Sequence, residues 1–141
     1  MKKVISVSVF VLLVASFFAV NSIAADKKAQ ATISKSAKVE VYYFHFTRRC
    51  VTCQAVEKES QAAIASLYPV QTKKGLITFK TVNLDEKSSI ALAKKCKAEG
   101  QSLLVISNGK RIDLTEQGFM YAKMSPEKLK AELKKTIDPL L

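Results

Sequence analysis

The feature that most constrains the fold is an apolar run that leads directly into a pair of cysteines. Residues 39–46 read VEVYYFHF, which is rich in β-branched and aromatic residues and nearly continuous in apolarity. Such a run is typical of a central strand that is covered on both faces. After residues 47–49 the apolar period becomes that of a helix. Cys50 is therefore predicted at a strand-to-helix junction, on or just before the first helical turn.

The rest of the chain continues the alternation of strands and helices. The first helix ends at Tyr68-Pro69, since a proline disfavours helical backbone in the residue before it. Its predicted buried stripe consists of Cys53, Val56, Ser60, Ala63, Ile64 and Leu67. A second strand is predicted over residues 76–84, after a turn at 73–75, and a shorter helix over 86–98. We expect Asp85 to cap that helix and Gly100 to stop it.

The last third of the chain predicts a hairpin and a closing helix. Strands over residues 103–107 and 110–114 flank Asn108-Gly109, a strong two-residue hairpin signal. Ser125 as N-cap and Pro126 at the first helical position open the last helix. Its predicted buried stripe consists of Leu129, Leu133 and Ile137. The order β-α-β-α-β-β-α predicts an α/β fold, a mixed four-stranded sheet with helices on both faces.

The first residues of the chain read as an export signal in front of one domain. Lys2 and Lys3 precede an apolar run over residues 4–20, and small residues follow it. We expect cleavage after Ala24, with Ala25 as the alternative, hence a signal peptide over 1–24 and a periplasmic or otherwise exported protein. The rival is an uncleaved anchor helix, but the run is short for a span of about 20 residues. Residues 25–37 predict a flexible tether, and 38–141 a single domain without stable membrane insertion.

The charge balance is strongly basic, with a net charge of +11. The lysines are scattered, and no basic patch interleaved with aromatic residues appears, so we expect a solvated surface and no nucleic-acid partner. Attraction to anionic lipid head groups or to acidic partners stays open.

The chain has three cysteines, and their meaning depends on the compartment. Outside the cytoplasm disulfides persist, and an odd number leaves one thiol, Cys96, without an intramolecular partner. Cys50 and Cys53 then form a redox couple, a structural disulfide or part of a metal site. The placement favours redox work, because a helix N-terminus and the adjacent Arg48 and Arg49 lower the pKa of Cys50. Cys50 is the predicted attacking thiol and Cys53 the resolving one.

The order of elements, with CxxC at the first strand-to-helix junction, resembles the thioredoxin fold over about residues 38–138. The stretch YYFHFTRRCVTC is similar to small exported bacterial thioredoxin-like proteins with an Arg-Cys-x-Thr-Cys motif, catalogued as nitrophenyl-compound nitroreductase subunits. The resemblance implies a thiol–disulfide oxidoreductase that exchanges electrons through Cys50 and Cys53 with protein dithiols or disulfides. An electron donor or a nitroreductase is a further expected partner. No cofactor is expected, since nothing resembles a nucleotide loop or a flavin site.

Two positions depart from the thioredoxin pattern. Thioredoxins carry a buried aspartate six residues before the first cysteine, where this chain has Phe44. His45 or Glu57 would have to replace it. The cis-proline that faces the CxxC in the family falls at Gln101, followed by Ser102. These two residues are the predicted substrate loop. In the family that loop also hinders metal capture by the dithiol, so its loss raises the metal alternative.

Three further predictions concern single side chains. His45 is either a packed, hydrogen-bonded side chain or a charged neighbour of Cys50. Cys96 is either a small core residue or a third redox thiol. The aromatic residues expected in the core are Tyr42, Tyr43, Phe44 and Phe46.

Two other functions are alternatives to redox exchange. One is a metal- or metalloid-binding module that uses both thiolates with His45 or Cys96, and the other is a non-catalytic interaction domain.

Overall fold

The computed structural model describes residues 39–141, so the predicted signal peptide and tether lie outside the described residues. The elements, in chain order, are β1 (Val39–His45), α1 (Val51–Leu67), α2 (Pro69–Lys73), β2 (Ile77–Asn83), η1 (Lys87–Ser89), α3 (Ile90–Cys96), β3 (Ser102–Ser107), β4 (Lys110–Asp113), α4 (Thr115–Tyr121), α5 (Pro126–Ile137) and η2 (Asp138–Leu140). None of the helices between residues 39 and 141 has the length and apolarity to cross a bilayer.

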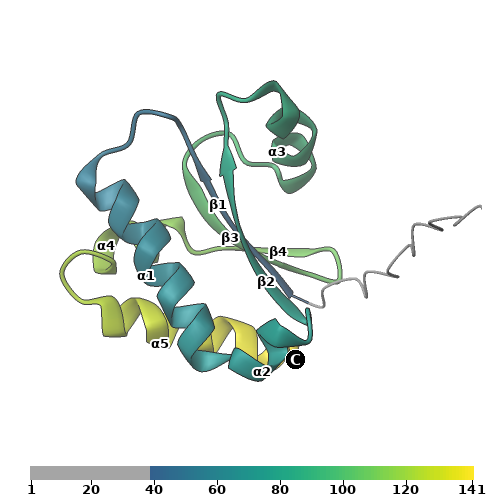
Figure 1. The fold of residues 1–141 in the computed structure, drawn as a ribbon, viewed down its shortest axis with the longest axis vertical. Coiled ribbons are helices and arrows are strands. Elements are labelled where there is room, and N and C mark those ends of the chain that lie inside the picture. Colours follow the sequence, from purple (N-terminus) through teal and green to yellow (C-terminus); the bar gives the residue numbers. More distant parts are fainter. Residues whose placement is uncertain (1–38) are drawn as a thin grey trace, which may run out of the picture. The chain divides into compact units, whose positions relative to one another are not determined.

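The strands form one mixed sheet in the order β2-β1-β3-β4 (Figure 1). β1 runs parallel to β2 and antiparallel to β3, with Tyr43 opposite Thr81 on one side and Leu103 on the other. β3 and β4 form an antiparallel hairpin. The predicted central strand is therefore confirmed over residues 39–45, one residue shorter than expected.

Each face of the sheet carries its own apolar cluster. Alternate residues of β1 point to opposite faces, so Val41 and Tyr43 join α1 and α5, whereas Tyr42 and Phe44 join α3. Figure 1 shows α3 on the side of the sheet opposite to α1 and α5. A mixed four-stranded sheet with helices on both faces, led by β1 and α1, is the thioredoxin-like fold that the sequence predicted.

The buried residues predicted for the first and last helices are confirmed, except that Leu67 is only partly buried. The buried residues of α1 are Cys53, Val56, Ser60, Ala63 and Ile64, and those of α5 are Leu129, Leu133 and Ile137. Leu67 is only partly buried against the same cluster. Phe46 lies outside the core, contrary to the prediction: it is 39% exposed and follows the last residue of β1.

The hairpin turn also follows the prediction. Asn108 and Gly109 have φ angles of 49° and 77°. Positive φ at both central residues suits the twist of a two-residue hairpin, and Asn-Gly tolerates it better than other pairs.

The helix predicted over 86–98 is shorter than expected and has different ends. It consists of η1 and α3, and Lys97, with a φ of 52°, ends it before Gly100 is reached. Asp85 does not cap it, because its carboxylate accepts a hydrogen bond from the backbone of Thr47 instead. Ser125 does occupy the N-cap position of α5, although its side chain makes no capping hydrogen bond.

Two short α-helices, α2 and α4, were missed. α2 is only five residues long and starts at Pro69, which fits the preference of proline for a first helical position. α4 follows β4 directly, and its Gly118 packs closely between α1 and β3. A Cβ at that position would lie 3.1 Å from Val56 Cγ1 and 3.3 Å from Leu103 Cδ2. The glycine thus lets α4 approach the first half of α1.

Candidate redox site

The site is built at the junction between β1 and α1. Cys50 is the N-cap residue of α1, with extended backbone at φ −76° and ψ 165°. Its Sγ accepts a hydrogen bond of 3.2 Å from the backbone N–H of Cys53, one of the donors that a helix N-terminus leaves unpaired. The two cysteines form a disulfide with a Cα–Cα distance of 5.1 Å. Sequence spacing and fold together therefore place both sulfurs at the positive end of the helix.

The two cysteines differ in access. Cys50 is exposed, whereas Cys53 has only 4% of its surface accessible because it lies on the buried face of α1. A partner from solution can approach Cys50 directly, whereas the surface of Cys53 is almost entirely covered. The assignment of Cys50 as attacking and Cys53 as resolving thiol stays a prediction that this geometry supports.

The two arginines before the CxxC have different surroundings. Arg48 is exposed, but Arg49 is half-buried and forms an ion pair with Glu57, two helical turns from Cys50 along α1. The carboxylate of Glu57 partly neutralises this guanidinium, so we expect Arg49 to stabilise a Cys50 thiolate less than an unpaired arginine would. Arg49 also acts on Tyr43. Burial raises the pKa of that phenol, and the charge of Arg49 opposes the rise.

Of the two residues in the predicted substrate loop, only Gln101 contacts a cysteine of the site. The side-chain amide of Gln101 lies against the buried cysteine, with Oε1 3.3 Å from Cys53 Sγ. Ser102 is instead the first residue of β3, paired with Phe44 and buried. Its hydroxyl donates to the carbonyl of Gly100 at 3.1 Å, which fixes the turn that carries Gln101.

Phe44 and His45 are the last two residues of β1, the strand that leads to the site. His45 is buried, its Nδ1 lies 3.0 Å from the carbonyl oxygen of Phe46, and its ring stacks on Tyr43. Within residues 39–141 His45 is therefore packed and hydrogen-bonded, and a charge interaction with Cys50 stays a prediction. Phe44 is fully buried in the cluster on the α3 face of β1.

Sequence reasoning missed the residues that hold the loop before Cys50. The backbone N–H of Thr47 donates to Asp85 Oδ2 at 2.7 Å, and Asn83 Nδ2 donates to Thr47 Oγ1 at 3.0 Å. The hydrogen bonds from Thr47 lower the pKa of Asp85. Polar residues at the end of β2 were visible in the sequence. Their partner, Thr47, lies 36 residues before Asn83 and 38 before Asp85, and it follows only from the parallel pairing of β1 and β2.

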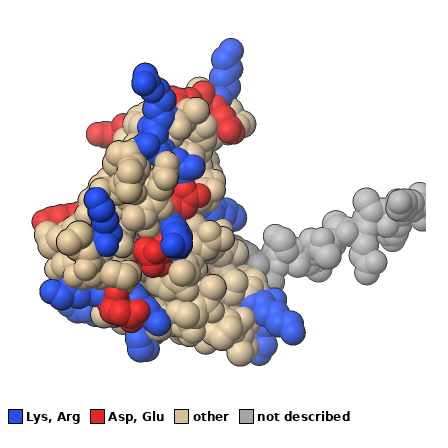
Figure 2. Space-filling view, turned by 60° about the vertical axis from the view of Figure 1, so that its left-hand side comes forward, with Lys and Arg blue, Asp and Glu red and all other residues tan. Residues whose placement is uncertain are grey.

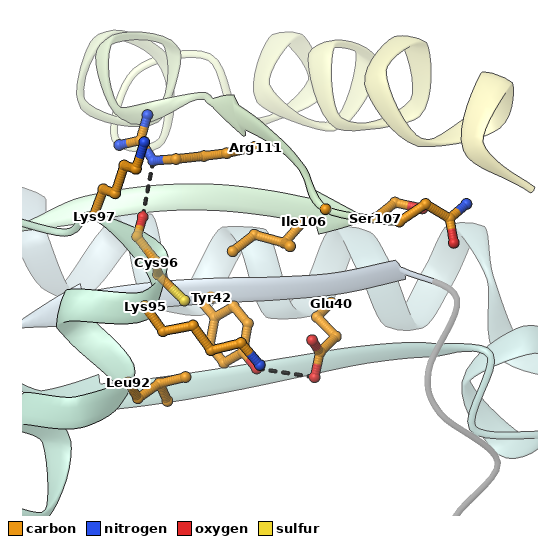
Figure 3. Close-up of a pocket in the computed structure, with 11 residues that line it drawn as sticks. Glu40, Tyr42, Leu92, Lys95, Cys96, Lys97, Ile106, Ser107 and Arg111 are labelled. Atoms are coloured by element: carbon orange, nitrogen blue, oxygen red, sulfur yellow. Dashed lines mark hydrogen bonds between the residues drawn. The ribbon is translucent and has the colours of Figure 1, made fainter.

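Cys96 lies apart from the CxxC, on the opposite face of the sheet. It is buried between α3 and β1 and lines a pocket of about 400 Å³ together with Tyr42 and Arg111. Figure 3 shows its sulfur directed toward the ring of Tyr42, while its carbonyl accepts a 3.0 Å hydrogen bond from Arg111. Burial raises the pKa of the Cys96 thiol. The prediction of a core cysteine is confirmed, and the sheet separates this thiol from Cys53.

On the face shown in Figure 2, lysine and arginine side chains are interspersed with acidic and neutral residues and form no single continuous patch. Among the residues that the structure describes, no three His, Cys, Asp or Glu side chains gather in a way that could hold a metal ion.

Comparisons with known proteins give structural similarity only. No family model matches the chain, and no curated protein matches it. A solved structure described as a malarial protein is 22% identical, covers 70% of this chain and 96% of its own, and has a TM-score of 0.44. The structure of Trxlp from Edwardsiella tarda EIB202 is 20% identical, covers 76% of this chain and 92% of its own, and has a TM-score of 0.46. At such values neither similarity transfers an activity to this chain.

Proposed function

We propose that this protein is an exported thiol–disulfide oxidoreductase that exchanges electrons with protein dithiols or disulfides through Cys50 and Cys53. One observation carries the proposal: an exposed cysteine at the N-cap of α1 is disulfide-bonded to a buried cysteine one turn further along. A helix N-terminus stabilises a thiolate, and the thiolate is the reactive form of cysteine.

The exchange is a pair of displacements with balanced electrons. The Cys50 thiolate attacks a sulfur of the partner's disulfide, which forms a mixed disulfide and releases the first partner sulfur as a thiolate. Cys53 then loses its proton and attacks Cys50 Sγ, and the second partner sulfur leaves as a thiolate. The partner gains two electrons and two protons, and Cys50 and Cys53 are oxidised to the disulfide. The reverse sequence oxidises a partner dithiol.

The cellular setting of the proposal rests on the sequence. The apolar run over residues 4–20 and the small residues after it support export, where an oxidised CxxC persists. The similarity of YYFHFTRRCVTC to nitroreductase-subunit proteins supports a role as an electron-passing accessory to such a partner. A protein partner suits an exposed Cys50 at the surface of the domain.

The test uses the mature chain in both directions of exchange. Wild type should accelerate the reduction of insulin by dithiothreitol, and its disulfide form should oxidise a peptide with two thiols. Cys50→Ser should abolish both activities, whereas Cys96→Ala, which also removes one sulfur, should retain them. If wild type accelerates neither reaction over the small-molecule background, the proposal is wrong.

A further inference from the structure

The buried cysteine has a polar partner from a distant part of the chain. Gln101, in the loop between α3 and β3, places its Oε1 3.3 Å from Cys53 Sγ, across 48 residues of sequence. Gln101 is itself half-buried, and the turn behind it is fixed by the hydrogen bond from Ser102 to Gly100. The amide is therefore held against the sulfur by the fold.

A primary amide suits a sulfur that changes its protonation state. Its oxygen accepts a hydrogen bond from a thiol, and its nitrogen donates one to a thiolate after a half-turn of the amide. The disulfide has no hydrogen on Cys53, so the oxygen facing it makes no S–H···O bond. Reduction supplies that hydrogen at a distance suited to a hydrogen bond to sulfur.

We propose that Gln101 is a positioning residue for the resolving thiol, and that its amide bonds to Cys53 in the reduced pair but not in the disulfide. This inference rests on the redox function proposed above. An interaction present in only one state shifts the equilibrium toward that state, so Gln101 favours the dithiol. Phe44, which stands where thioredoxins carry a buried aspartate, is packed on the α3 face and cannot take this role.

The same contact acts on the second displacement. Cys53 must release its proton to solvent and keep its sulfur aligned on Cys50 Sγ while the partner's sulfur leaves as a thiolate. The amide donates no proton in this step and accepts none. It holds the sulfur, and its N–H stabilises the thiolate that attacks.

The two displacements can be separated with dithiobis(nitrobenzoate), an aromatic disulfide whose thiolate product is coloured. Attack by Cys50 releases the first coloured thiolate at a rate proportional to reagent concentration. Attack by Cys53 on the resulting mixed disulfide releases the second at a rate independent of it. The second phase therefore reports Cys53 alone, and its pH profile reports the ionisation of that thiol.

Three variants of the full mature chain test the proposal. Gln101→Met keeps the length of the side chain without hydrogen bonding, and Gln101→Glu puts a carboxylate beside the thiolate. Gln54→Met is the matched control, since Gln54 is exposed and adjacent to Cys53 in sequence. Circular dichroism melting shows that each variant is folded before its chemistry is compared.

We expect Gln101→Met to shift the glutathione equilibrium about threefold toward the disulfide, the scale of one modest hydrogen bond. Gln101→Glu should move the pH midpoint of the second phase upward, because a carboxylate opposes ionisation of Cys53. Gln54→Met should change neither. If folded Gln101→Met and Gln101→Glu match wild type in both readouts, the positioning role is refuted. Absence of the first, concentration-dependent phase in wild type would instead refute the redox function itself.

Discussion

Glu57 holds the guanidinium of Arg49 on the side of α1, so a positive charge beside the CxxC is tied to a carboxylate. Both side chains are about one-quarter exposed, with relative accessibilities of 26% and 25%. The pair directs Arg49 along the helix, and we expect it to moderate the effect of the arginine charge on Cys50.

Removing the carboxylate should therefore make Cys50 a stronger acid. We expect Glu57→Gln to lower the pH midpoint of Cys50 alkylation by a few tenths of a unit, since partly exposed pairs are weak. Glu59→Gln is the matched control, because Glu59 pairs with Lys58 on the same helix. Peptide mass spectrometry of the reduced, folded protein gives the midpoint. An unchanged or raised midpoint would mean that Arg49 does not act on Cys50.

The three thiols should differ clearly in reactivity. Cys50 is exposed at a helix N-terminus, Cys53 is buried behind it, and burial raises the pKa of Cys96. Alkylation of the reduced protein at mildly acidic pH should label Cys50 first and Cys96 last. Equal labelling of the three in folded protein would remove the case for an activated Cys50.

The hydrogen bond between Thr47 and Asp85, which holds the loop before Cys50, should contribute to stability in a pH-dependent way. Hydrogen bonds from Thr47 lower the pKa of Asp85, so the folded pKa lies below the unfolded value near 3.8. The stabilisation by ionised Asp85 is complete above that unfolded pKa and is lost as pH falls through the folded one. We expect Asp85→Asn to melt below wild type at pH 6, and the difference to vanish in acid.

The control for the Thr47–Asp85 hydrogen bond is the neighbouring residue Glu86. Glu86→Gln removes the same charge from a carboxylate that accepts from Ser88 rather than from Thr47. If Glu86→Gln reproduces the pH dependence of Asp85→Asn, the effect belongs to net charge and not to the Thr47 contact.

Stability should depend on the face of a helix that a side chain occupies. Ile137 on α5 is fully buried, whereas Ile90 at the start of α3 is 62% exposed. Ile137→Ala should lower the free energy of unfolding by about 2–5 kcal/mol, the range for truncating a buried aliphatic residue. Ile90→Ala, the same change at the surface, should stay within about 0.5 kcal/mol. Denaturant titration measures both, and equal losses would contradict the assigned packing of α5.

The sequence predicted most of the sheet because its signals are local. β1 is a nearly continuous apolar run, Asn108-Gly109 tolerates the positive φ angles of a two-residue hairpin turn, and Ser125-Pro126 marks the start of α5. α4 escaped prediction because it is seven residues long and contains Gly118, a poor helix former. Its place follows from close packing on Val56, which no local pattern records.

Parts of the site that depend on the position of a residue in a strand or helix could be predicted from the sequence. Parts that depend on contacts between distant segments could not. Cys50 as N-cap follows from the change of period after β1. Asp85 looked like a helix cap, but the parallel pairing of β1 and β2 gives it Thr47 as a partner instead. Gln101 was expected to face the CxxC only through the thioredoxin resemblance. Its contact with Cys53 depends on how the α3–β3 loop is folded.

The reduction potential of the Cys50–Cys53 pair tests the account most directly. The lowered Cys50 pKa that we expect and the hydrogen bond to reduced Cys53 that we propose would both stabilise the dithiol, and each pKa unit is worth about 30 mV. Equilibration of the mature protein in glutathione buffers, with both states resolved by alkylation and mass, gives the value. We predict a potential above about −250 mV, more oxidising than the thioredoxin value of about −270 mV. A value at or below about −280 mV would contradict the account and indicate a dedicated reductant or a structural disulfide.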